Sequence, residues 1–166
     1  AVWASSWRWN SFHWNGRSEV DADVYEASSV TVDPAALTSG ADQAYFEGLM
    51  KGEVRLQFCS GCDTHHWPAV FRCPECGSWD HVWKPVSPKG TIYSWTRTWH
   101  AFGGLDAFQA PFVSLVVSLQ GVPSVRLLGT LQGREGGLAI GAPVTGQVHS
   151  VEFLDRPIPA LSWSLV

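Results

Sequence analysis

The spacing of hydrophobic and polar positions predicts one short helix followed by five strands. After Asp42, a suitable N-cap residue, four apolar residues recur three and four positions apart, and Gly52 is suited to end the helix. From Gly90 onward, runs rich in Val, Leu, Trp and Thr are separated by glycine and proline, as strands are separated by turns. The helix residues are Tyr45, Phe46, Leu49 and Met50, and the predicted strands are Thr91–Trp99, Phe112–Leu119, Ser124–Leu131, Val144–Phe153 and Leu161–Val166.

The five predicted strands indicate a five-stranded Greek-key barrel of the OB type, with a sandwich-like sheet as the alternative. Nine of the 16 glycines lie between positions 103 and 146, where a small closed sheet needs turns and bends. Residues 136–141 are expected to form one helical turn between the third and fourth strands.

All four cysteines lie in two CxxC pairs between the helix and the first barrel strand. They are Cys59, Cys62, Cys73 and Cys76. Each CxxC turn can direct two thiolates at one metal ion, and four thiolates suit tetrahedral Zn²⁺ at ~2.3 Å. We therefore expect a structural zinc with no open coordination position; rubredoxin-like iron and a redox dithiol are the alternatives.

Neighbouring residues complete the expected zinc ribbon. Gly61 and Gly77 are expected to supply the tight backbone positions of the two CxxC turns. His65 and His66 lie in the ten-residue spacer and are expected to be exposed loop residues, because four cysteines already complete the metal's coordination. The alternative is that either histidine replaces a cysteine ligand or titrates at an interface.

The charge balance argues against a nucleic-acid partner. Lys plus Arg total 11 and Asp plus Glu total 15, which gives a net charge of −4. Four thiolates and one Zn²⁺ bring the metallated protein near −6, so there is no basic stripe for a phosphate backbone. The longest interior apolar stretch, residues 112–119, is too short to span a bilayer. Metal-binding cysteine pairs favour a reducing compartment, which indicates the cytoplasm.

The start of the chain follows none of these patterns. Four of the 10 tryptophans, Trp3, Trp7, Trp9 and Trp14, fall within the first 14 residues, and residues 21–40 have the composition of a linker. The predicted division is a Trp-rich extension and linker at 1–41, a helical segment at 42–53, a zinc ribbon at 54–86 and an OB-fold at 87–166. We expect the extension to pack on a partner subunit or on the chain's own barrel.

The order of these features resembles one bacterial and archaeal family, long described as domain of unknown function thirty-five and as acyl-CoA-associated. The resemblance covers about residues 42–156. It rests on the segments 45–49, 52–59, 67–68, 73–78, 90–96 and 140–144. It implies a mainly β fold with a small α part: an N-terminal helical segment, a rubredoxin-like zinc ribbon and a C-terminal five-stranded OB-fold.

The resemblance also implies a function. Family members are small partners of thiolase-like enzymes, including thiolases and the aldolases that remove side-chain carbons in steroid catabolism. The larger partner carries the chemistry, and the small subunit stabilises it and helps to form its acyl-CoA site. The expected assembly is a heterotetramer, and some members are fused to a hotdog-fold hydratase domain.

Candidate binding residues lie around the first barrel strand. The sequence has no GxSxG, HExxH, GxGxxG or Walker motif, so no catalytic residue is predicted. A twelve-residue connection, 100–111, carries phenylalanines that can dock on a partner or on a pantetheine arm, or cap the barrel end. The candidates for CoA binding or an interface are Lys89, Arg97, Trp95, Trp99, His100, Phe102 and Phe108. Other basic candidates for CoA phosphates are Arg72, Lys84 and Arg126.

Two other functions compete with the accessory role. Strand period places Thr91, Tyr93, Trp95 and Trp99 on one face, and aromatic residues on an OB-fold face can stack nucleic-acid bases. A single-stranded nucleic-acid-binding protein is therefore the main alternative. An independent acyl-CoA enzyme is the third hypothesis.

Overall fold

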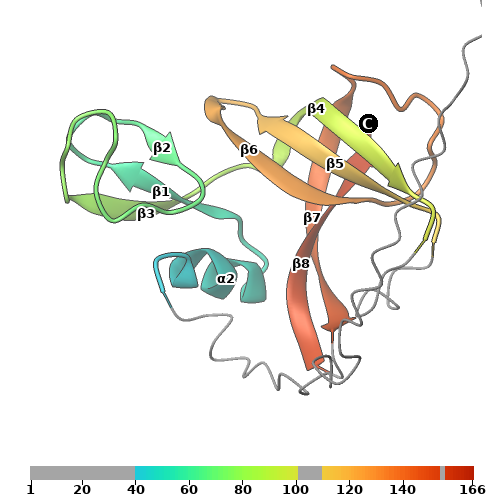
Figure 1. Ribbon diagram of the computed structural model, residues 1–166, viewed down its shortest axis with the longest axis horizontal. Helices are drawn as coiled ribbons and strands as arrows, with labels where there is room; N and C mark the ends of the chain where they lie inside the picture. Colours follow the sequence, from blue (N-terminus) through green and yellow to red (C-terminus); the bar gives the residue numbers. More distant parts are fainter. Residues whose placement is uncertain (1–39, 101–109, 154–155) are drawn as a thin grey trace, which may run out of the picture. The chain divides into compact units, whose positions relative to one another are not determined.

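The computed structural model describes residues 40–100, 110–153 and 156–166. Mostly strands and one short helix build a four-cysteine region and a closed five-stranded barrel, as predicted (Figure 1). The elements are α2 (Gln43–Met50), β1 (Arg55–Cys59), β2 (His65–His66), β3 (His81–Pro85), β4 (Lys89–Thr98), β5 (Phe112–Leu119), β6 (Val122–Leu131), β7 (Pro143–Phe153) and β8 (Arg156–Leu165).

The helix α2 begins and ends where the sequence predicts, but the side chain of its N-cap residue, Asp42, does not cap it. The carbonyl of Asp42 accepts the N–H of Tyr45 at 3.0 Å, whereas its side chain makes no capping hydrogen bond. Instead, Asp42 Oδ1 accepts the N–H of Ala69 at 3.0 Å, so the carboxylate ties the helix to the ribbon. Gly52 follows the helix with a φ of +77°, a conformation that favours glycine.

One face of α2 enters the core. Tyr45 and Leu49 are buried, whereas Met50, predicted on the same face, is exposed. Burial raises the pKa of Tyr45 to about 12, and its ring lies 3.9 Å from the ring of Trp67. The helix therefore packs its apolar face against the ribbon through aromatic contacts.

The ribbon is a small antiparallel sheet in the order β2-β1-β3. The central strand β1 pairs Gln57 with His66 on one side and Cys59 with His81 on the other. The buried amide of Gln57 also donates to and accepts from the backbone of Val70, both at 2.8 Å. This double hydrogen bond fixes the loop that leads from β2 to Cys73.

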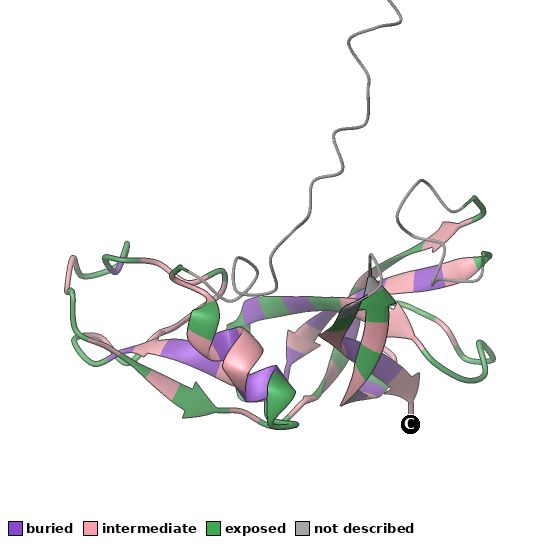
Figure 2. Cartoon of the chain, turned by 90° about the horizontal axis from the view of Figure 1, so that it is seen from below, coloured by how far each residue is buried: buried purple, intermediate pink, exposed green. Residues whose placement is uncertain are grey.

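The barrel closes in the order β4-β5-β6-β8-β7, with a parallel contact between β6 and β8. Strand β5 alternates strictly between half-buried and buried positions, which is the period-two pattern of a barrel wall. Figure 2 shows this alternation of burial along the strands. The buried residues of β5 are Val113, Leu115, Val117 and Leu119.

Trp163 on β8 fills the barrel interior and is 0% exposed. Two glycines make room for its indole. A Cβ at Gly129 would lie 2.6 Å from Trp163 Nε1, and a Cβ at Gly146 would lie 2.8 Å from its six-membered ring. The barrel core thus needs one large side chain and two positions without a side chain.

Two local predictions are wrong. Strand β8 begins at Arg156 rather than Leu161, because the ladder with β7 continues through Pro157 and Pro159. Alternate prolines are tolerated where their nitrogens face the unpaired edge of a strand. Residues 136–141 form two hydrogen-bonded turns, Glu135–Leu138 and Ala139–Ala142, rather than one helical turn.

The buried residues of helix, ribbon and barrel form one hydrophobic cluster. Leu49 of α2, Leu56 of β1 and Trp163 of β8 all belong to it. Half-buried Trp67 and Trp83 of the ribbon pack against it. No helix within the described ranges is long and apolar enough to cross a membrane.

Candidate metal centre

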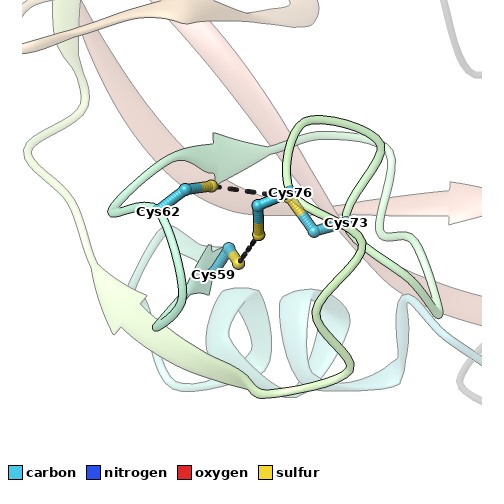
Figure 3. Close-up of side chains that lie close together, drawn as sticks. All are labelled: Cys59, Cys62, Cys73 and Cys76. Atoms are coloured by element: carbon cyan, nitrogen blue, oxygen red, sulfur yellow. Dashed lines mark hydrogen bonds between the residues drawn. The ribbon is translucent and has the colours of Figure 1, made fainter.

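The four predicted cysteines meet in one group, with all four sulfur atoms within 4.8 Å of one another. The sulfurs of Cys59 and Cys76 are 3.6 Å apart, as are those of Cys62 and Cys73 (Figure 3). A tetrahedral site with ~2.3 Å zinc–sulfur bonds places its sulfurs ~3.8 Å apart. The described cysteines are therefore positioned to bind one metal ion and leave it no open position.

The two CxxC turns have matching backbones. The N–H of Asp63 bonds to the carbonyl of Cys59 at 3.0 Å, and the N–H of Gly77 bonds to that of Cys73 at 2.9 Å. The residue after each second cysteine has positive φ: Asp63 at 57° and Gly77 at 75°. The left-handed position in the first turn is thus Asp63.

The expectation for Gly77 is therefore confirmed, whereas the conformational role given to Gly61 is wrong. Gly61 serves a steric need. A Cβ added at Gly61 would lie 3.0 Å from the Cβ of Ser78 and 3.2 Å from Cys76 Sγ.

The pKa values of the Cys73 and Cys76 thiols are shifted in opposite directions. Burial raises the pKa of Cys73, but hydrogen bonds from the backbone N–H groups of Cys76 and Glu75 and from neighbouring thiols lower it to about 6. A hydrogen bond from the backbone of Ser78 lowers the pKa of Cys76, but burial and the other sulfurs raise it to about 12. Clustered thiols resist joint ionisation because their negative charges repel, and a divalent cation removes that repulsion.

The two spacer histidines are not exposed loop residues. Both lie on β2 and are half-buried. The ring of His65 lies 4.9 Å from that of Phe58, and His66 Nε2 lies 3.3 Å from Cys73 Sγ. Consecutive residues of a strand point to opposite faces, so His65 and His66 lie on opposite faces of the ribbon. The sequence could have indicated this only if β2 had been recognised as a strand.

The predicted aromatic face of β4 is divided by a bulge. The ladder to β5 shifts between Ile92 and Ser94, so Thr91 pairs with Ser118 but Trp95 pairs with buried Leu115. Thr91 and Trp95 therefore lie on opposite faces of the sheet, and the prediction of one shared face is wrong.

The aromatic residues near the end of β4 are accessible. Trp95 is 37% exposed and Trp99 is 65% exposed. The guanidinium of Arg97 lies 5.6 Å from the Trp99 ring and forms an ion pair with Glu135.

The other interface candidates are dispersed. Lys89 is exposed at the start of β4 and His100 is exposed two residues after its end, and Lys89 has no side-chain partner in the described ranges. Phe102 and Phe108 lie outside the described residues. The remaining basic candidates stack on rings: Arg72 on Trp79, Lys84 on Phe58 and Arg126 on Tyr93.

A groove of about 380 Å³ between the end of α2 and strands β7 and β8 was not predicted. Its walls include Leu49, Met50 and Ile158, together with His149. The Nδ1 atom of His149 is buried and has no hydrogen-bond partner among the described residues. Pro157, Ile158 and Pro159 line the groove, so it depends on the part of β8 that was not predicted from the sequence.

Fold and centre define a zinc-ribbon/OB-fold protein, and two family models match it in sequence. The rubredoxin-like zinc ribbon domain of ChsH2 matches residues 46–81, and its C-terminal OB-fold domain matches residues 83–149. The chain belongs to this ChsH2 (DUF35) family.

Solved structures give the same result. The chain is 26% identical to a chain of the "Ltp2-ChsH2(DUF35) aldolase", with a TM-score of 0.65, and the match covers 76% of this chain and 95% of that one. A DUF35-family protein of unknown function from Sulfolobus solfataricus shares the fold at 18% identity and a TM-score of 0.51, over 87% of this chain and 95% of that one. No curated protein matches this sequence.

Proposed function

We propose that this protein is a non-catalytic accessory subunit that binds and stabilises a thiolase-like enzyme and helps to form its acyl-CoA site. The match to the Ltp2-ChsH2(DUF35) aldolase, over 95% of that chain, carries this proposal. The partner would cleave carbon–carbon bonds of acyl-CoA, as a thiolase or a steroid side-chain aldolase. The assembly we propose is a cytoplasmic heterotetramer, and a hotdog-fold hydratase domain is a further component to seek in it.

We propose Zn²⁺ as the resident metal, with a structural role. Four sulfur donors at tetrahedral separations suit zinc. When bound, zinc would compensate the clustered thiolates and hold β1 to the second CxxC turn. Cys59, Cys62, Cys73 and Cys76 would supply all four ligands.

The described residues proposed to meet the partner or CoA lie on β4 or within two residues of its end. Trp95 and Trp99 expose indole surface, and aromatic residues with arginine are enriched where proteins meet. Lys89 has no side-chain partner among the described residues and can meet a phosphate group, whereas Arg97 would first have to leave Glu135. Phe102 and Phe108 remain candidates from the sequence.

Co-purification tests the proposal. The affinity-tagged chain, isolated from its native cells, is expected to bring down a thiolase-fold enzyme at a fixed stoichiometry, identified by mass spectrometry. The complex should survive nuclease treatment and 0.5 M salt. A chain that elutes without an enzyme would overturn the accessory role. Co-elution with single-stranded nucleic acid, lost in a Trp95→Ala variant, would favour the nucleic-acid-binding alternative.

A further inference from the structure

We propose that His66 is a positioning residue of the metal centre that donates a hydrogen bond from Nε2 to the Cys73 sulfur and slows release of the bound metal. The two atoms are 3.3 Å apart. This inference concerns the stability of the centre and is independent of which partner enzyme the protein binds.

Strand register explains why His66 reaches the centre. His66 on β2 pairs with Gln57 on β1, and directly paired residues share a face of the sheet. Cys59 lies two residues beyond Gln57 and therefore on the same face. The ribbon sheet thus directs His66 toward the sulfurs, while adjacent His65 points to the opposite face, against Phe58.

The chemistry of a metal-bound thiolate sets the direction of the hydrogen bond. A thiolate has no proton to donate, so a nitrogen within hydrogen-bond distance of it must carry the hydrogen. His66 Nε2 therefore has to carry a hydrogen. Cys73 is 2% exposed, so protein groups rather than bulk water must satisfy its sulfur.

His66 adds a side-chain donor to the backbone donors that the turn supplies. The backbone N–H groups of Glu75 and Cys76 also act on Cys73 Sγ and favour its ionised form. Both belong to the same CxxC turn as Cys73, whereas His66 reaches the sulfur from a separate strand. It therefore links the second turn to the ribbon sheet. His66 does not belong to the group of described side chains able to hold the ion, which comprises only the four cysteines.

Such outer contacts usually change metal affinity by ~10- to 100-fold when they are removed. We expect His66→Phe, which keeps a ring but loses the donor, to transfer zinc to a chromophoric chelator at least ~10-fold faster than the wild type at pH 7.5. His66→Gln retains an N–H at a similar reach and should stay within ~3-fold of the wild type. The matched control is His65→Gln, on the opposite face, which should release zinc at the wild-type rate.

Zinc release from His66→Phe at the wild-type rate would overturn the proposal. Nitrogen-15 NMR of the zinc-loaded wild type gives a second test that needs no variant and so applies even if His66→Phe does not fold. We expect Nε2 of His66 to carry a hydrogen whose exchange with solvent is slowed. An Nδ1–H tautomer would contradict the proposal.

Discussion

Removing one thiolate by Cys73→Ser is expected to abolish tight zinc binding and to unfold the ribbon, residues 54–86. Cys73 is buried, and its sulfur lies 3.6 Å from that of Cys62 and 3.3 Å from His66. Structural zinc contributes ~10–16 kcal/mol of apparent binding free energy in small zinc domains, and that energy is coupled to folding. Three sulfurs and a hydroxyl cannot supply it.

Hydrogen exchange with zinc analysis measures this effect. We expect wild-type protein to hold about one zinc per chain, while Cys73→Ser loses both the zinc and the protection of the amides in β1 and β3. The amides of β5 should stay protected, because β5 and its buried residues belong to the barrel rather than to the ribbon. Ser60→Ala, an exposed change between two ligands, should keep both properties. A Cys73→Ser protein with full protection in β1 would show that the metal does not fold the ribbon.

Trp163→Ala is expected to destabilise the barrel by ~3–5 kcal/mol, as large-to-small changes of buried aromatic residues do. The indole is fully buried and fills the space that Gly129 and Gly146 leave open. Neighbouring residues cannot close a cavity of this size without moving two strands. Such a loss is a large part of the total stability of an ordinary domain.

Denaturant unfolding followed by far-ultraviolet circular dichroism tests this prediction. Trp99→Ala is the control, because that side chain is 65% exposed and the guanidinium of Arg97 lies 5.6 Å from the centre of its ring. It should cost less than ~1 kcal/mol. Trp163→Phe should give an intermediate loss. Equal costs at positions 163 and 99 would mean that the barrel is not organised around Trp163.

The sequence predicted the elements that depend on local pattern. A run rich in Val and Leu, bounded by proline and glycine, located β5, and the paired CxxC motifs located the four cysteines that are positioned to bind a metal, because both signals lie within a few residues. It failed where long-range pairing decides. Pro157 and Pro159 are typical of a segment between strands, yet both pair with β7 as part of β8. A bulge after Ile92 reversed the face of Trp95, and spacing alone does not encode a bulge.

The metal centre shows the same division. The four cysteines that are positioned to bind a metal were recognised from the sequence alone. The contact between His66 and Cys73 depends on β2 being a two-residue strand paired with β1, and two residues carry no readable period. Asp42 likewise had the sequence signature of a cap, but a loop 27 residues away provided a backbone donor for its carboxylate.

Reconstituted turnover tests the central claim, an accessory role beside a thiolase-like enzyme, most directly. The zinc-loaded chain, its co-purifying enzyme and their mixture are each assayed for cleavage of acyl-CoA thioesters. We predict no turnover by this chain alone, low turnover by the enzyme alone and full turnover by the mixture, with saturation at equal subunit numbers. Turnover by the isolated chain, or full activity of the enzyme without it, would contradict the account.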